Sequence, residues 1–248
     1  NYMQIITVDF DRTLYQQDSI AATLKAGGAT FSLRQWGNII KDIVMGIVNR
    51  KGEEKTGIPI LFLESFFQQM KGRSRDEIDE FFISLTEKGQ GGINWDLVST
   101  ITGHLNDGSK VIILSGALQP FLEVFIEYLG MEADVIGTQL FFDEKGICTG
   151  RIGKINNGIE KVNRLKAWID ENNVGDRKIW AYADSESDVP LLEFADKAIV
   201  VQPSDALKRL AESKGWETFT PTQGLLGPFP RIEIILESTV NIFLHKKD

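Results

Sequence analysis

Short, uninterrupted apolar runs recur along the chain and predict buried β-strands. Such runs occupy residues 3–8, 110–114, 178–183 and 197–201. Because apolar and polar residues do not alternate within them, they indicate strands that are covered on both faces, as in a parallel sheet. Helical patterns separate these strands, at residues 119–129, 159–171 and 188–194. Strands that alternate with helices predict an α/β domain built on a doubly wound, mostly parallel sheet.

The alternation is interrupted after the first strand by a long stretch of helical periodicity. Apolar side chains recur there at helical spacing, at Ile39, Ile43, Phe62, Phe66, Ile78 and Phe82. We therefore expect a helical insertion at residues 15–92. Residues 1–14 and 93–248 are expected to form the α/β core.

Glycine-rich segments mark two further features of the chain. The insertion ends in Gly89-Gln90-Gly91-Gly92, which is interpreted as a flexible joint, although a glycine cluster alone favours a plain loop. Residues 138–152 have alternating character around the turn signal Asp143-Glu144-Lys145-Gly146, which predicts a β-hairpin. Within the insertion, Trp36 and Phe62 are expected to form its apolar core rather than to contact a ligand.

Composition and charge narrow the classes of partner. The chain has 248 residues and is 42% hydrophobic, enough to bury a sizeable core. Its formal net charge of −8 argues against a nucleic-acid partner, which requires a basic face. The longest apolar stretch, residues 58–67, is too short to cross a bilayer, so no membrane partner is expected. The oligomeric state stays open.

The cysteine content and the first residues bear on location. Cys148 is the only cysteine, so no intrachain disulfide can form, which fits a reducing compartment. No signal-peptide pattern is visible at the start, because residues 3–8 form a short strand pattern instead. We therefore expect a cytoplasmic protein, while a leader trimmed before Asn1 stays open.

Two carboxylates follow the first predicted strand. Asp9 and Asp11 lie in the sequence Val8-Asp9-Phe10-Asp11-Arg12-Thr13-Leu14. Residues i and i+2 of a strand face the same side, so the two side chains could converge. Like charges at close range are costly unless a cation or a shared proton holds them. This pair predicts a divalent-metal site with one carboxylate available as nucleophile or acid/base.

Polar residues also end two other predicted strands. Ser115-Gly116 follows the strand at 110–114, and the third strand is followed by Asp184-Ser185-Glu186-Ser187-Asp188. Taken alone, the first is more readily a mere βα turn than part of a site, and the second is equally a helix N-cap. In open α/β sheets, however, ligands bind beyond the carboxyl ends of the strands. Three such motifs at one sheet edge therefore favour a binding site.

These residue types suit phosphoryl transfer. Mg²⁺ prefers carboxylate oxygens, an aspartate can attack phosphorus, and a serine hydroxyl with backbone N–H groups can hold phosphate oxygens. A lysine would neutralise the charge on the transferring group. Lys161, near the start of its predicted helix, is the candidate. Lys154 and Lys166 are rivals on composition alone, and a solvated helix lysine is the commoner case.

Four motifs in this order resemble those of the haloacid dehalogenase-like (HAD) superfamily of phosphohydrolases. They are Asp9-Phe10-Asp11-Arg12-Thr13, Leu114-Ser115-Gly116, Lys161 and Asp184-Ser185-Glu186-Ser187-Asp188. The position of the helical insertion is similar to that of the cap in the phosphoserine-phosphatase-like branch. The resemblance implies a Rossmann-like core with a helical cap that closes over the site.

The resemblance also implies roles for individual residues. Asp9 would be the nucleophile and a Mg²⁺ ligand, and Asp11 the general acid/base, with its backbone carbonyl on the metal. Asp184 would complete the protein ligands of the metal, with Asp188 in support. Thr13 would steady the first loop. The phosphate-binding residues would be Ser115, Gly116 and Lys161.

Three positions depart from the pattern of true phosphoserine phosphatases. Arg12, Asp18 and Ser187 stand where that branch usually carries Ser, Glu and Asn, so we expect them to read the substrate's non-phosphate end. Arg12 has an equally good interpretation as a surface arginine paired with a cap carboxylate.

The expected function is a Mg²⁺-dependent phosphatase that acts on a small phosphorylated metabolite through a phospho-aspartyl intermediate. Two alternatives stay open, namely a phosphotransferase of the same fold and a non-catalytic phosphate-ligand binding protein.

Overall fold

The computed structural model describes residues 2–49 and 57–222. In this part of the chain, six parallel strands form one sheet in the order β3-β2-β1-β6-β7-β8. Their bounds are β1 Met3–Val8, β2 Lys110–Leu118, β3 Asp134–Thr138, β6 Arg177–Ala183, β7 Lys197–Val201 and β8 Glu217–Phe219. The four predicted strands are thus confirmed as β1, β2, β6 and β7, whereas the edge strands β3 and β8 were not predicted.

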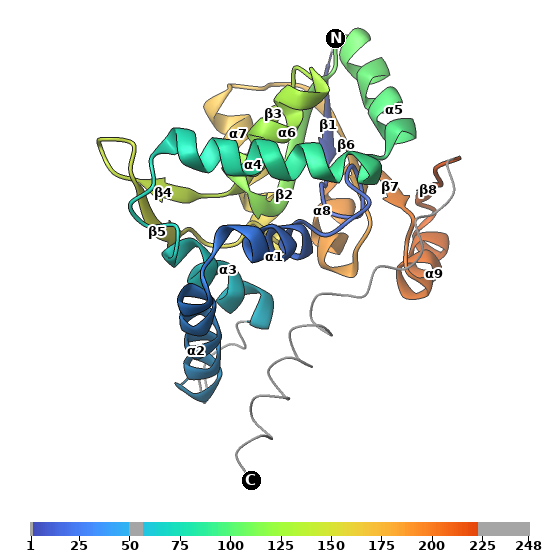
Figure 1. Cartoon of the computed structure of the whole chain (residues 1–248). Helices are drawn as coiled ribbons and strands as arrows, with labels where there is room; N and C mark the ends of the chain where they lie inside the picture. The colour runs from blue at the N-terminus through green and yellow to red at the C-terminus, as the bar shows by residue number, and fades with distance from the viewer. Residues whose placement is uncertain (1, 50–56, 223–248) are drawn as a thin grey trace.

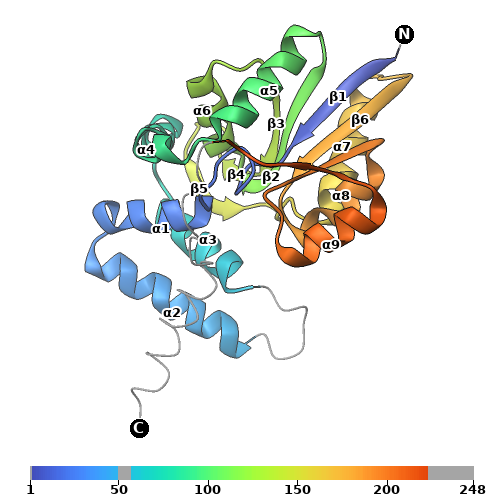
Figure 2. The ribbon, with the colours of Figure 1, turned by 90° about the vertical axis from the view of Figure 1, so that its right-hand side faces the viewer.

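Helices cover both faces of the sheet (Figures 1 and 2). Successive β2 residues alternate between the faces, with Ile113 in one core cluster and Ile112 in the other. One face packs against α5 (Trp95–Asn106) and α6 (Gln119–Leu129). The helices on the opposite face are α7 Ile159–Glu171, α8 Val189–Phe194 and α9 Asp205–Lys214. The doubly wound α/β class predicted from the sequence is therefore correct.

The chain between β1 and β2 is helical before it reaches α5. Its elements are α1 Ser19–Thr30, α2 Leu33–Asn49, α3 Ile58–Gln68, α4 Arg75–Gly89 and the 3₁₀ turn η1 Gln90–Gly92. Figure 2 shows α1, α2 and α3 grouped beside the sheet, with α2 outermost. Phe62 is fully buried in the core that these helices share with the sheet, and the partly buried Trp36 packs against that core, as expected from the sequence. Among the described residues, no helix is long and apolar enough to cross a membrane.

Close packing explains Gly89 and Gly92, two glycines of the segment that the sequence predicts to be a flexible joint. A Cβ atom on Gly89 would lie 2.5 Å from the hydroxyl oxygen of Tyr15, and one on Gly92 would lie 2.8 Å from both Tyr15 and Gln17. The chain can pass so near Tyr15 only because these residues lack side chains. The segment is an ordered turn continuous with α4, so packing accounts for the glycines without a joint.

The predicted hairpin is confirmed. Strands β4 (Leu140–Phe142) and β5 (Cys148–Ile152) pair antiparallel. The Asp143 carboxylate accepts hydrogen bonds from the backbone N–H groups of Lys145 and Ile147, and Gly146 takes the positive φ of 74° that the turn requires. The hairpin reaches the helical insertion, because Gly72 N–H donates to Cys148 C=O at 2.9 Å.

Candidate active site

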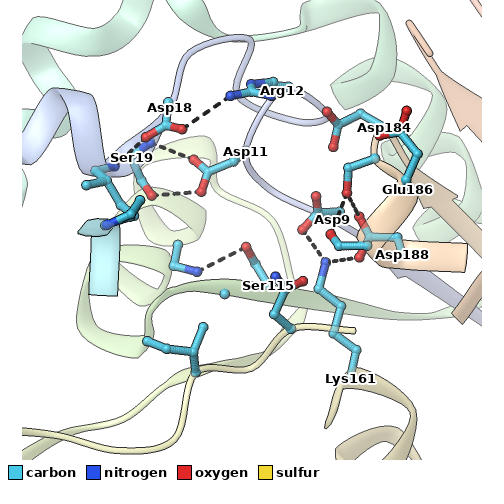
Figure 3. A pocket seen from close by; sticks show the side chains of 18 of the residues that line it. Asp9, Asp11, Arg12, Asp18, Ser19, Ser115, Lys161, Asp184, Glu186 and Asp188 are labelled. Atoms are coloured by element: carbon cyan, nitrogen blue, oxygen red, sulfur yellow. Dashed lines mark hydrogen bonds and ion pairs between the residues drawn. The ribbon is translucent and has the colours of Figure 1, made fainter. Parts of the chain in front are cut away.

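A cavity of about 540 Å³ opens at the carboxyl ends of the central strands (Figure 3). Its walls come from the segments that follow β1, β6 and β7, from the last part of β2, and from the start of α7. Ser19 and Ile20 of α1 and Pro59, Ile60 and Leu63 of α3 complete the lining. Both the α/β core and the helical insertion therefore contribute to one cavity, which has the volume of a small-molecule site.

Four charged side chains converge at the base of this cavity. Asp9 directly follows β1, and its N–H donates to the carbonyl of Tyr182 in β6. The ammonium of Lys161, in the first turn of α7, lies 2.7 Å from Asp9 Oδ1 and 2.5 Å from Asp188 Oδ1. Carboxylate oxygens of Asp9, Asp184 and Asp188 all lie within 4.8 Å of one another. We call this group the acidic cluster; its members are Asp9, Lys161, Asp184 and Asp188.

The carboxylates of the acidic cluster carry more negative charge than Lys161 alone balances. Burial, followed by repulsion from Asp9 and Asp188, raises the pKa of Asp184 well above its ordinary value. Burial also raises the pKa of Asp9, although Lys161 opposes the shift. For Lys161 itself, burial alone would lower the pKa, but Asp188 and Asp9 outweigh burial and raise it. A cation between the carboxylates would relieve their repulsion, and hard oxygen donors suit Mg²⁺, so the residues fit this metal.

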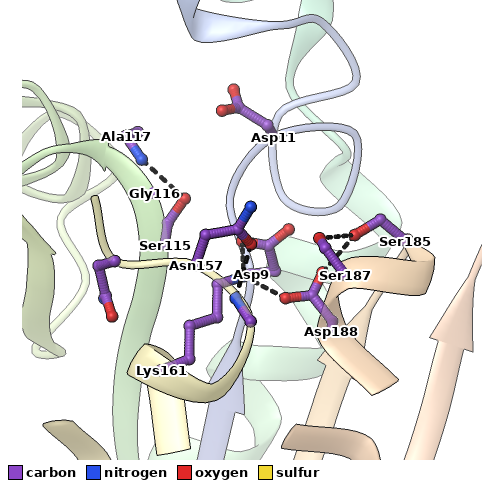
Figure 4. Close-up of polar contacts among 12 residues, drawn as sticks. Asp9, Asp11, Ser115, Gly116, Ala117, Asn157, Lys161, Ser185, Ser187 and Asp188 are labelled. Atoms are coloured by element: carbon purple, nitrogen blue, oxygen red, sulfur yellow. Dashed lines mark hydrogen bonds and ion pairs between the residues drawn. The ribbon is translucent and has the colours of Figure 1, made fainter. Parts of the chain in front are cut away.

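Asp188 is held on both sides by protein groups. Its Oδ1 atom contacts Lys161, and its Oδ2 atom accepts a hydrogen bond from Ser185 Oγ at 2.7 Å (Figure 4). Asp188 precedes α8 without capping it, and Ser185 makes no side-chain cap for the short 3₁₀ turn that follows it. The side chains of Asp188 and Ser185 therefore do not cap a helix. Asp188 contacts Lys161 and Ser185 instead.

The Asp11 carboxylate lies apart from the acidic cluster. Its two oxygens accept hydrogen bonds from the N–H of Ser19 at 2.7 Å and from the hydroxyl of Ser19 at 2.8 Å. Figure 3 shows it turned toward the start of α1 rather than toward Asp9. Burial, followed by the charges of Asp18 and Asp9, raises the pKa of Asp11 well above its ordinary value. This environment favours the protonated acid, which is the form that a proton donor needs.

Ser115 and Gly116 form the wall of the cavity opposite Asp188. Ser115 is buried, and its Oγ atom accepts a hydrogen bond from Ala117 N–H at 3.2 Å (Figure 4). A Cβ atom on Gly116 would meet nothing nearer than 3.6 Å, so close packing is not the reason for this glycine. Gly116 instead lines the cavity together with Ser115 and Ala117.

The predicted substrate-reading residues all line the cavity, but each also has a protein partner. Asp18 caps α1 by accepting from the N–H groups of Ile20 and Ala21. Arg12, with a positive φ of 59°, lies 3.5 Å from Asp18. Ser187 is exposed and bonds to Ser185 Oγ at 2.7 Å. The pairing of Arg12 with a cap carboxylate, one of its two interpretations, is therefore present.

Neither rival lysine reaches the acidic cluster. Lys154 pairs with Glu160 at 2.7 Å with its side chain 74% exposed, and Lys166 lies over the ring of Phe194. Thr13 is fully buried, in keeping with a structural role in the first loop. Sequence reasoning missed Ser19 and Ser185 as partners of Asp11 and Asp188, and it missed the start of α3 as cavity wall. Ser19 directly follows Asp18, and Ser185 directly follows Asp184. This adjacency to candidate aspartates is the one feature of the sequence that points to the two serines.

The sequence of this chain is similar to those of known hydrolases and phosphatases. The family described as haloacid dehalogenase-like hydrolase has a sequence model that matches residues 6–193. A phosphoserine phosphatase of Mycobacterium tuberculosis is 29% identical over 125 residues, which cover 50% of this chain and 40% of that protein. A histidinol-phosphatase of Neisseria meningitidis is 28% identical over 120 residues, which cover 47% of this chain and 54% of that protein. The matches thus span about half or less of these relatives.

A solved structure supports the fold over a longer stretch. A protein of unknown function from Bordetella pertussis superposes with a TM-score of 0.73 at 23% identity, covering 88% of this chain and 99% of that one. At this identity the likeness concerns the fold. The family match runs from within β1 into α8 and so includes every member of the acidic cluster. We conclude that the chain belongs to the haloacid dehalogenase-like hydrolase family.

Proposed function

We propose that this protein is a Mg²⁺-dependent phosphatase that hydrolyses a small phosphorylated metabolite through a phospho-aspartyl intermediate. The observation that carries the proposal is the acidic cluster at the base of the cavity. In this cluster, the buried ammonium of Lys161 lies 2.7 Å from the buried carboxylate of Asp9. Carboxylate oxygens of Asp184 and Asp188 lie within 4.8 Å of Asp9 and of each other. The family membership and the phosphatase names of two relatives support the same chemistry.

In the first half-reaction, a carboxylate oxygen of Asp9 attacks phosphorus and the bond to the leaving oxygen breaks. Asp11 gives its proton to that oxygen, so an alcohol departs and an acyl phosphate remains on Asp9. In the second half-reaction, Asp11 takes a proton from water, the hydroxide attacks phosphorus, and Asp9 is released as a carboxylate. Asp11 must turn from Ser19 toward the phosphoryl group to do so.

The other residues of the site bind and orient the phosphoryl group. Lys161, held between Asp9 and Asp188, places a positive charge where the phosphoryl oxygens lie. Ser115 and the backbone at Gly116 hold the opposite side of the group. Mg²⁺, when bound by Asp9, Asp184 and the Asp11 carbonyl with support from Asp188, supplies charge neutralisation during transfer.

Substrate choice belongs to the part of the cavity that the phosphate does not occupy. Arg12, Asp18 and Ser187 line it together with the apolar side chains Ile60 and Leu63 at the start of α3. We infer that residues 15–92 act as a cap that excludes bulk water and contacts the leaving group. The substrate is then a phosphomonoester whose organic part offers both polar and apolar surface.

The test is phosphate release from a generic aryl phosphate, with Mg²⁺ and with a chelator instead. The proposal predicts release only with Mg²⁺, loss of release in Asp9→Asn, and equal amounts of phenol and phosphate. A phosphotransferase would yield more phenol than phosphate when an alcohol acceptor is added. No release from any phosphomonoester by the folded protein in Mg²⁺ would indicate a binding protein and refute the proposal.

A further inference from the structure

The part of β2 that carries Ser115 and Gly116 is irregular and interrupts the ladder between β2 and β3. Leu114 pairs with Ile136 and Leu118 pairs with Thr138, with a register shift between the two pairs. Residues 115–117 therefore leave the regular ladder where they line the cavity. Buried backbone groups in such a segment need partners from elsewhere.

Thr138, at the end of β3, supplies one of these partners. Its side chain is fully buried and does not line the cavity. Its hydroxyl donates to the Gly116 carbonyl at 2.7 Å and accepts from the backbone N–H of Asn156 at 3.1 Å. The direction of both bonds is fixed, because a carbonyl can only accept and an N–H can only donate.

The planarity of the peptide bond extends this contact to Ser115. The Gly116 carbonyl and the Ala117 N–H belong to one peptide unit and point in opposite directions. Holding the carbonyl on Thr138 therefore aims the N–H at Ser115 Oγ, which accepts it at 3.2 Å. With its acceptor side engaged in this way, the Ser115 hydroxyl can donate its proton into the cavity.

The same threonine also touches the segment that leads to Lys161. Asn156 is fully buried, and its side-chain amide donates to Ile136 C=O in β3 at 2.8 Å. Two residues later, Gly158 precedes α7 and accepts the N–H of Lys161 at 3.1 Å. The Thr138 hydroxyl thus connects the irregular part of β2, on one side of the cavity, to the segment that leads into α7 on the other.

We propose that Thr138 is a positioning residue that sets the spacing between the Ser115–Gly116 segment of β2 and the Lys161 helix, and thereby the affinity for phosphate. The proposal rests on the proposed function only in naming phosphate as the group held there. It predicts that the hydroxyl matters for phosphate binding beyond its effect on stability.

The test compares variants by their dissociation constant for inorganic phosphate in Mg²⁺, together with KM and kcat. Thr138→Val keeps the shape of the side chain but removes its hydroxyl. We expect about tenfold weaker phosphate binding, because the Ser115 hydroxyl would no longer be aimed at the phosphate and one charge-assisted hydrogen bond would be lost. Thr138→Ser should stay within about threefold of the parent, and Thr138→Cys, a weak donor, should fall between them. KM should rise more than kcat falls.

Thr86→Val is the matched control. Thr86 is also buried and donates its hydroxyl to a carbonyl, that of Phe82, but it lies in α4. It should lose similar stability and keep its phosphate affinity. Unchanged phosphate affinity in Thr138→Val, or in Thr138→Cys should Thr138→Val not fold, would overturn the inference.

Phosphate binding also separates this inference from the proposed function. A parent protein that binds phosphate without hydrolysing esters would refute the function and leave the role of Thr138 to be decided by the variants. An active phosphatase in which Thr138→Val binds phosphate normally would refute only the role of Thr138. A parent protein that binds no phosphate would refute both.

Discussion

At the scale of single residues, Lys161 supplies the buried positive charge that faces the carboxylates of Asp9 and Asp188. Its ammonium is 2% exposed and touches two carboxylates that are also buried. A buried ion pair contributes little net stability, but removing one partner leaves a charge without compensation. Lys161 therefore has a structural role in the absence of substrate as well as the proposed role in binding phosphate.

Lys161→Met should destabilise the metal-free protein by about 3 kcal/mol, because Asp9 and Asp188 lose their shared counter-charge. Urea unfolding measures this loss. In millimolar Mg²⁺ the loss should be smaller, since a bound cation would replace part of the missing charge. Lys166→Met, on the same helix but exposed, should change stability by less than about 0.5 kcal/mol. Equal effects of the two substitutions would contradict the assignment of Lys161.

Asp184→Asn should stabilise the metal-free protein, because it removes a buried charge that Asp9 and Asp188 repel. Since the pKa of Asp184 is raised from its ordinary value of 3.8, the folded state holds a proton that the unfolded state releases. The contribution of Asp184 to the stability of the metal-free parent therefore falls as pH rises above about 4, and this contribution should be absent from the variant.

The same substitution should abolish the gain in Tm that Mg²⁺ gives the parent protein. Thermal unfolding with EDTA and with Mg²⁺, at two pH values, checks both expectations. A variant that is less stable in EDTA, yet still stabilised by Mg²⁺, would show that Asp184 is not part of a cation site.

The sequence predicted those site residues whose place follows from the sheet. Asp9 and Asp184 follow parallel strands, so their approach required only the α/β topology, and Lys161 was selected by its motif. The contacts of Asp11 could not be predicted in the same way. Its carboxylate is held by Ser19, and that contact depends on where α1 begins relative to the first loop.

At the scale of elements, the long, strongly periodic segments were predictable and the short edge strands were not. Strand β3 is a five-residue segment with Asp134 and Gly137 in it, and β8 has three residues, so neither carries a clear apolar pattern. Gly137 is needed because a Cβ atom there would lie 2.8 Å from the Ala117 carbonyl oxygen. A sequence does not reveal such a close approach, since it is a property of the assembled sheet.

The packing of η1 against the first loop gives a matched pair of substitutions. Gly92→Ala should lose about 1–3 kcal/mol, because the new methyl group would overlap Tyr15 and Gln17. Gly91→Ala should be neutral or slightly stabilising, since nothing lies within 4 Å of the added atom. Chemical denaturation measures both. Equal stability of the two variants would restore the interpretation of this segment as a flexible joint.

At the scale of the whole molecule, residues of the α/β core and of the helical insertion line one cavity, and the proposed function assigns the chemistry to the core and the organic part of the ligand to the insertion. Discrimination between substrates depends on groups that touch their variable part, whereas phosphate contacts serve all of them alike. In the proposed function, Arg12, Asp18 and Ser187, which depart from the phosphoserine phosphatase pattern, line the part of the cavity that would contact this variable part.

Phosphoserine should therefore be a poor substrate in a screen of phosphorylated metabolites that includes histidinol phosphate. Substitution of Arg12 or Asp18 should change the ranking of substrates more than the rate on a small generic phosphate. Values of kcat/KM across the screen test this expectation. A kcat/KM for phosphoserine far above that for every other small phosphate would contradict this expectation and identify the protein as a phosphoserine phosphatase.

The central claim, that Asp9 is the nucleophile of a phosphatase, is tested most directly by trapping the acyl phosphate. The protein is quenched in acid during turnover and reduced with borohydride, which converts an aspartyl phosphate to an alcohol, and the peptide containing residue 9 is analysed by mass spectrometry. The account predicts reduction at Asp9 only when substrate and Mg²⁺ were present, and none in Asp9→Asn. Reduction at another carboxylate, or steady hydrolysis by the Asp9→Asn protein, would contradict it.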